Sequence, residues 1–198
     1  MRHDVWLYAF HVLFYLTFLP RVLERRRSEA PAAAEGAAPP ARARFARGVL
    51  LFHMVGFFFL YFGINASIFD FRAVRPQPLF PPQRLAAAIV LLAASGLSLW
   101  ALAYFRSWRV RAELAADHEL ATGGPFRFVR HPIYLAMALL ALGSFLWLPR
   151  PLVAFGALLV MAGCDVRART EEKLLVATFG DRYREYMARV KRFVPGIY

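Results

Sequence analysis

Two short stretches of the sequence hold the residue types that could bind a charged small molecule. In the first, Pro132 is well placed as the first residue of a helix, because the N–H that proline lacks is not needed there. His131 would then lie near the N-cap. The start of such a helix offers free N–H groups and the positive end of its dipole, and Arg130 is adjacent, so this end suits an anion. Alternatively, Arg130 extends only to lipid headgroups.

The second stretch is 167–173, which places two carboxylates side by side in a chain poor in acidic residues. On a helix, Arg167 and Glu171 are four residues apart on one face, and Arg169 and Glu172 are three apart on another. The pattern therefore fits either a salt-bridged helix beside the membrane or a binding site that faces the first stretch.

A third stretch, in the tail, repeats large side chains at helical spacing: Tyr183, Tyr186, Met187 and Val190. This spacing predicts an amphipathic helix that lies on the membrane or covers the site. The single cysteine, Cys164, lies in an apolar stretch and is expected to pack rather than react. No His, Cys and carboxylate cluster has metal-ligand spacing, so no metal site is expected.

The elements that must position these residues are membrane helices. Hydrophobic residues make up 59% of the 198 residues and charged residues 19%, and the apolar residues form long runs. We expect an all-α integral membrane protein with about five spans and a helical tail. The spans are 5–22, bent or ended by Pro20, then 48–69, 85–105, 132–148 and 151–166. Pro149-Arg150-Pro151 should join the last two in a tight hairpin.

The chain is expected to be one domain with two parts. Residues 1–105 hold three spans and a flexible Ala/Pro-rich loop at 28–44. Residues 106–198 hold a cofactor-binding loop, the hairpin and the catalytic tail. His11, His53 and Asn65 lie within spans and could line a pathway or join helices by hydrogen bonds.

The net charge of +12 comes largely from arginines beside the spans, which indicates topology rather than a nucleic-acid partner. Loops 23–47 and 106–131 and the tail are the arginine-rich ones. The positive-inside rule then puts the N-terminus outside, with the C-terminus and the site on the cytoplasmic face, at the inner membrane if the source is bacterial.

The motifs resemble those of the isoprenylcysteine carboxyl methyltransferases and the related membrane phospholipid methyltransferases. The resemblance covers about residues 110–198 and follows H-x-L-x-T-x-G-P-aromatic at 118–126, R-H-P-x-Y at 130–134, R-x-x-x-E-E-x-x-L at 167–175 and F-G-x-x-Y-x-x-Y at 179–186. It implies S-adenosylmethionine as the cofactor. No G-x-G-x-G loop of the soluble methyltransferases is present.

The resemblance also implies roles for individual residues. The adenosine end of the cofactor would be held by His118, Leu120 and Ala121. Glu171 would meet the cofactor from the tail, and Arg167 would orient the acceptor. The rest of the cofactor site would be lined by Phe126, His131, Pro132, Ile133 and Tyr134, and Arg130 suits the cofactor's carboxylate. Where this chain has Phe126 the family often has Tyr, which removes one hydroxyl contact.

Two other functions remain open at this point. Sterol reductases, which use NADPH, look similar around R-H-P-x-Y, and a non-enzymatic membrane protein could keep the fold. The acceptor is also open: a prenylated cysteine carboxylate, a lipid amine, or a small thiol or other hydrophobic metabolite would imply O-, N- or S-methylation respectively.

Overall fold

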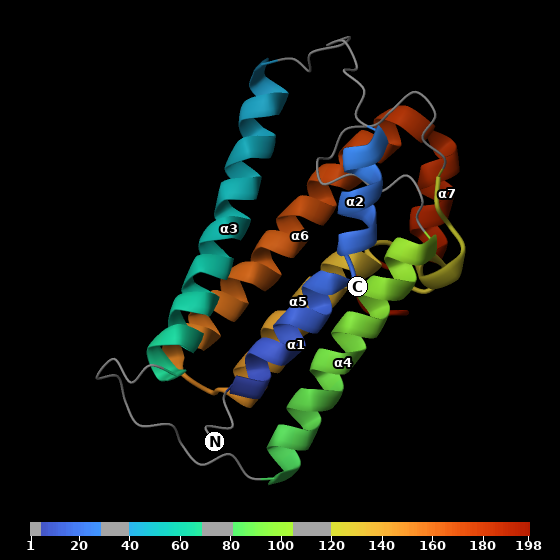
Figure 1. Ribbon diagram of the computed structural model, residues 1–198. Helices are drawn as coiled ribbons and strands as arrows, with labels where there is room; N and C mark the ends of the chain where they lie inside the picture. The colour runs from blue at the N-terminus through green and yellow to red at the C-terminus, as the bar shows by residue number, and fades with distance from the viewer. Residues whose placement is uncertain (1–4, 29–39, 69–80, 105–119) are drawn as a thin grey trace.

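The computed structural model describes residues 5–28, 40–68, 81–104 and 120–198, and these are helical throughout most of their length (Figure 1). The helices are α1 (Val5–Leu16), α2 (Leu19–Ser28), α3 (Pro40–Ile68), α4 (Pro81–Tyr104), α5 (Pro132–Trp147), α6 (Pro151–Phe179) and α7 (Asp181–Arg189), with a short 3-10 helix, η1, at Gly124–Arg127. His118 lies outside the described residues.

The chain is an all-α membrane protein, as the sequence predicts. Three of the described helices, α3, α4 and α6, are long and apolar enough to cross a membrane, and α1 and α5 are shorter apolar helices. The α5–α6 hairpin is confirmed, because only residues 148–150 separate the two helices and the Arg150 N–H donates to the Leu148 carbonyl at 2.8 Å.

The first span is interrupted near Pro20, as expected, but two boundaries differ from the sequence prediction: α6 continues without a break to Phe179, past the span end expected at 166, and α3 begins earlier than expected. The first span is divided into α1 and α2 around Thr17 and Phe18, just ahead of Pro20, because the proline ring would collide with the carbonyl of Leu16 four residues earlier. The helix of the second predicted span, α3, begins at Pro40, inside the segment expected to be a flexible loop. A proline followed by alanines and arginines favours a helix start there, so that part of the loop prediction is wrong.

The apolar core runs along the bundle and takes one side chain or more from each of five helices. Leu7, Leu60, Leu91, Leu140 and Val153, from α1, α3, α4, α5 and α6, are all fully buried. In Figure 1, α3 packs along α6 on one side and α4 along α5 on the other. The bundle holds the starts of α5 and α7 and the second half of α6 at one end.

Glycines let α3 and α6 approach each other closely, a feature that the sequence analysis did not use. A Cβ added at Gly56 of α3 would lie 2.8 Å from the Val160 backbone nitrogen, and one at Gly156 of α6 would lie 2.3 Å from the Leu60 nitrogen. Both glycines are followed seven residues later by another close-contact glycine. Helix α3 is thereby fixed against the helix that carries Arg167 and Glu171.

Polar side chains within the spans mostly join helices to one another. His11 of α1 lies 2.6 Å from the Tyr61 hydroxyl of α3 and 2.8 Å from the Ser144 hydroxyl of α5. The Tyr8 hydroxyl donates to Asn65 at 2.7 Å. For His11 and Asn65 the hydrogen-bonding alternative is therefore the one observed, whereas His53 packs its ring against Gly163 and Phe57.

Candidate functional site

A buried carboxylate, Glu172, joins the start of α5 to the tail. Arg130 donates to Glu172 Oε1 from Nε at 3.0 Å and from Nη2 at 2.8 Å. Arg192 donates to Oε1 at 3.0 Å and to Oε2 at 2.6 Å, and His131 Nε2 lies 3.3 Å from Oε1. Glu172 is 5% exposed, so this is a desolvated charge cluster in which each group depends on the others. The hydrogen bond to Glu172 raises the pKa of Arg192.

Backbone hydrogen bonds also join the start of α5 to the segment after α7. Val129 and Lys191 form a parallel β-bridge, and the Arg130 N–H donates to the Lys191 carbonyl at 2.8 Å. The Arg130 guanidinium also donates to the carbonyls of Met187 and Val190. The segment after α7 is therefore laid directly along the residues that open α5.

Tyr186 attaches α7 to the glycine-rich loop, the segment at 123–127 that contains Gly123 and Gly124. Its hydroxyl donates to the Phe126 carbonyl at 2.6 Å, and burial raises the pKa of Tyr186, which keeps the phenol a donor. The loop in turn rests on Tyr104 at the end of α4, since a Cβ at Gly123 would lie 1.9 Å from the Tyr104 hydroxyl. Gly124 has φ 56°, a conformation that glycine adopts without strain. This hydrogen bond fixes α7 beside the glycine-rich loop.

Four side chains, from the N-cap of α5, from α5 itself and from α6, make a second group, of which Glu171 is partly exposed. The rings of His131 and Tyr134 stack at 5.6 Å between centroids with 20° between planes. The Arg167 guanidinium carbon lies 5.1 Å from the Tyr134 ring centre. Glu171 Oε2 lies 3.7 Å from His131 Nδ1, and the Glu171 side chain is 32% exposed. An anion and a cation, one turn apart on α6, thus lie beside one aromatic pair.

The remaining residues predicted for the site lie around this group rather than in it. Leu120 and Ala121 are half-buried and lead into the glycine-rich loop, and Phe126 and Pro132 are buried. Ile133 is buried against Ala101 and Leu102 of α4. The structure brings His131, Tyr134, Arg167 and Glu171 together, whereas Arg130 is used by Glu172 and the tail.

Sequence reasoning missed part of this arrangement. It paired Arg169 with Glu172, but the ion pair of Arg169 is with Asp165 at 2.7 Å. The adjacent carboxylates at 171 and 172 were a usable signal for two roles, since neighbours on a helix face different directions. The role of Arg192 could not be predicted from the sequence, because no nearby residue indicates that its partner, Glu172, lies 20 residues earlier.

No group of three or more His, Cys, Asp or Glu side chains that could hold a metal ion occurs within the part of the chain that the structure describes. Cys164 is buried in the core between helices. At the site itself, the contacts of His131, Tyr134, Arg167 and Glu171 place an aromatic pair beside two opposite charges.

Comparison with known proteins identifies the family. A sequence profile described as phospholipid methyltransferase matches residues 83–182, just over half of the chain. The chain belongs to this family. Proteins named protein-S-isoprenylcysteine O-methyltransferase are similar to it as well: the Schizosaccharomyces pombe protein is 35% identical over 80 residues, which cover 40% of this chain and 34% of the relative.

Two further relatives with the same name agree. The Saccharomyces cerevisiae protein is 37% identical over 90 residues, or 44% of this chain and 37% of the relative. The human protein is 33% identical over 89 residues, or 44% of this chain and 31% of the relative. The chain thus matches about a third of the length of these relatives, and the resemblance to the isoprenylcysteine carboxyl methyltransferase group is confirmed.

The first and last residues of the phospholipid methyltransferase match show which parts of the structure it includes. It begins at the start of α4, so it includes a span that the sequence analysis had left outside the resemblance. It also includes Arg130, Glu171 and Glu172, but stops before Tyr186 and Arg192. Helices α1 to α3 lie outside the match.

Proposed function

We propose that the protein transfers a methyl group from S-adenosylmethionine to a lipophilic acceptor, with a prenylated cysteine carboxylate as the leading candidate. The observation that carries this proposal is the pair of opposite charges, Glu171 and Arg167, beside the stacked rings of His131 and Tyr134. Its occurrence inside the phospholipid methyltransferase match supports the proposal. The names of the relatives support the choice of acceptor.

The residues fit S-adenosylmethionine by their chemistry. When bound, this cofactor supplies a methyl group that its sulfonium has already activated. Glu171 is close to the aromatic pair yet partly exposed, so its carboxylate can hold a cationic group there. The rings of His131 and Tyr134 also give this place an aromatic surface, and aromatic rings attract a sulfonium as they attract other cations.

The adenosine end is assigned by position along the chain. His118, Leu120 and Ala121 precede the glycine-rich loop, and Phe126 and Pro132 follow on the same path toward the aromatic pair. Because Ile133 packs on α4, we propose that it holds the residues that line the cofactor site in place and does not contact the cofactor. Arg130 would act through Glu172, by holding the tail in place, rather than on the cofactor's carboxylate.

Arg167 would orient the acceptor. A carboxylate acceptor is already a nucleophile and needs no general base, so the protein's contribution is alignment and exclusion of water. A guanidinium can bind one carboxylate oxygen while leaving the other free to attack. An apolar acceptor could reach this place from the bilayer, between helices.

The site would face the cytoplasm. Support comes from the arginine-rich loops 23–47 and 106–131. The helix ends next to them in the sequence, those of α2 and α4 and the start of α3, lie at the end of the bundle that carries α7 (Figure 1). The two alternatives, an NADPH-dependent reductase and a non-enzymatic membrane protein, gain no support from the family match.

The test is a transfer assay with full-length protein in lipid vesicles and labelled methyl groups on S-adenosylmethionine. Three acceptors are compared: an S-prenylated cysteine, a phosphatidylethanolamine and a small thiol. The proposal expects label that base releases as methanol, the behaviour of a methyl ester, with the first acceptor. Label that base does not release from the lipid amine or the thiol would identify an N- or S-methyltransferase instead. No transfer to any of the three acceptors would contradict the proposed activity.

A further inference from the structure

A second polar site lies at the opposite end of the bundle, where α5 turns into α6. Arg150, the residue before α6, is only 7% exposed. Its Nε and Nη2 atoms are buried and have no hydrogen-bond partner among the described residues. A guanidinium buried without a counter-charge is strongly unfavourable, so this position calls for an anion.

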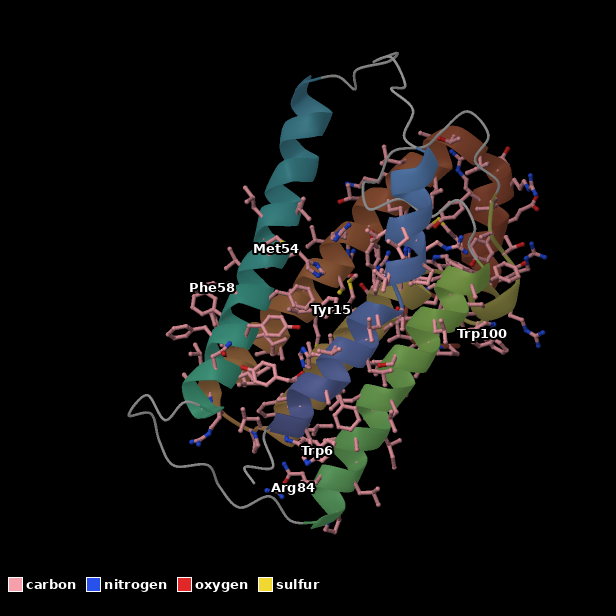
Figure 2. The ribbon with its side chains drawn as sticks, viewed as in Figure 1. Trp6, Tyr15, Met54, Phe58, Arg84 and Trp100 are labelled. Carbon is pink, nitrogen blue, oxygen red and sulfur yellow. The ribbon has the colours of Figure 1, made fainter. Side chains whose placement is uncertain are left out.

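Two more unpaired donors come from the neighbouring segments. The indole N–H of Trp147, three residues before Arg150, and Nε of Arg84 are likewise buried without a partner in the part of the chain described. Gln83 donates to the Leu146 carbonyl at 3.1 Å, which places the start of α4 against the end of α5. Figure 2 shows the Arg84 side chain at the end of the bundle where α1 begins.

The surroundings add positive potential and offer no described carboxylate. The acidic residues within the described segments lie on α2, in the second half of α6 and on α7: Glu24, Asp165, Glu171, Glu172, Asp181 and Glu185. Both α4 and α6 begin at this end, and helix starts carry partial positive charge. The two arginines are therefore uncompensated by any described group near them.

We propose that Arg84, Trp147 and Arg150 bind a phosphate group, supplied by an anionic phospholipid headgroup or by free phosphate. Arginine matches the paired oxygens of a phosphate, and an indole N–H donates to a third. The position, where the apolar helices end, is the depth at which headgroup phosphates lie. This site is independent of the proposed methyl transfer.

The experiment measures binding to the full-length protein in mild detergent by native mass spectrometry and by the thermal unfolding midpoint. Phosphatidylglycerol, phosphatidylcholine and inorganic phosphate are the probes. We expect phosphatidylglycerol to bind and raise the midpoint, with phosphatidylcholine weaker. Arg150→Gln should lose at least about tenfold in affinity, as expected for a charged hydrogen-bonded pair.

Two variants keep the test decisive. Arg182→Gln removes the same charge from an exposed position on α7 and should bind phosphatidylglycerol as the parent does. Trp147→Phe keeps an aromatic ring in the core and removes the N–H donor together with part of the indole, so a weaker but clear loss of binding is expected even if Arg150→Gln fails to fold. Binding of inorganic phosphate in place of the lipid, with the same losses, would support the site and identify free phosphate as its ligand.

Other outcomes would overturn the proposal. One is equal binding of the two lipids, or equal loss in Arg182→Gln. Another is a midpoint lowered by Arg150→Gln to the same extent with and without anionic lipid, which would mean that a carboxylate of the chain itself, such as Asp70, compensates the arginine.

Discussion

Arg130 and Glu172 lie 42 residues apart in the sequence and are joined by two hydrogen bonds of 3.0 and 2.8 Å. This contact ties the start of α5 to the second half of α6, and Arg192 extends it to the last segment of the chain. The loop, the hairpin and the tail therefore form one unit. The neighbouring Glu171 is left partly exposed, which separates a structural carboxylate from one available to a ligand.

Glu172→Gln is expected to destabilise this unit. The substitution leaves Arg130 buried without a counter-charge and leaves Arg192 only its contact with Asp165, at 3.2 Å. Breaking a buried ion pair in this way costs about 3–5 kcal/mol. The measurement is the unfolding midpoint in detergent. Glu185→Gln, on the exposed face of α7, is the matched control and should have almost no effect. Equal midpoints for the two variants would show that the cluster does not hold the tail.

Tyr186→Phe should weaken the attachment of α7 without altering the core. The substitution removes only the hydroxyl that donates to the Phe126 carbonyl, and a buried hydrogen bond of this kind is worth about 1 kcal/mol. The expected result is faster amide hydrogen exchange in α7 and the glycine-rich loop. Unchanged exchange in both segments would argue that the contact is dispensable.

Gly56→Ala should disturb the packing of α3 on α6. The added methyl would meet backbone at 2.8 Å, which a side-chain rotation cannot relieve, and overpacking of this kind costs about 1–3 kcal/mol. Gly96→Ala in α4 is the control, because nothing lies within 4 Å of its Cβ position. Alanine is the better helix former, so the control should be neutral or more stable. The thermal midpoints of the two variants should move in opposite directions, and a shared direction would contradict this account.

Arg167→Ala tests the assignment of the acceptor position. If Arg167 orients the acceptor, the variant should keep its affinity for S-adenosylmethionine and lose methyl transfer, by about tenfold or more for one charged hydrogen bond. Arg169→Ala, which removes a guanidinium that is exposed and paired with Asp165, is the control. A loss of cofactor affinity in Arg167→Ala, with turnover at saturating cofactor unchanged, would put Arg167 on the cofactor instead.

The sequence predicted those features of the fold that are determined by neighbouring residues in the chain. The start of α5 at Pro132 follows from proline's missing N–H, and the break after Phe179 follows from Gly180, which has φ 56°. The start at Pro132 was predicted correctly. The hairpin was predictable for the same reason, because two prolines flank Arg150.

The rest depends on partners that are far apart in the chain. Nothing near Glu172 reveals that Arg130 and Arg192 converge on it, and helical spacing alone offered Arg169 as a partner. The contact between α3 and α6 likewise requires knowing that these two helices are neighbours, although the glycine spacing in each was visible. Burial of Arg150 could not be predicted, since a turn between spans is ordinarily exposed.

The central claim is that Glu171, beside His131 and Tyr134, holds S-adenosylmethionine. The most direct measurement is calorimetric titration of the detergent-purified protein with S-adenosylmethionine, repeated with Glu171→Gln and with NADPH as the comparison ligand. We predict saturable binding of S-adenosylmethionine, a loss of about tenfold or more in affinity for Glu171→Gln, as for one charged hydrogen bond, and no binding of NADPH. Equal affinity in the variant would contradict the role of Glu171, and binding of NADPH alone would contradict the methyltransferase account.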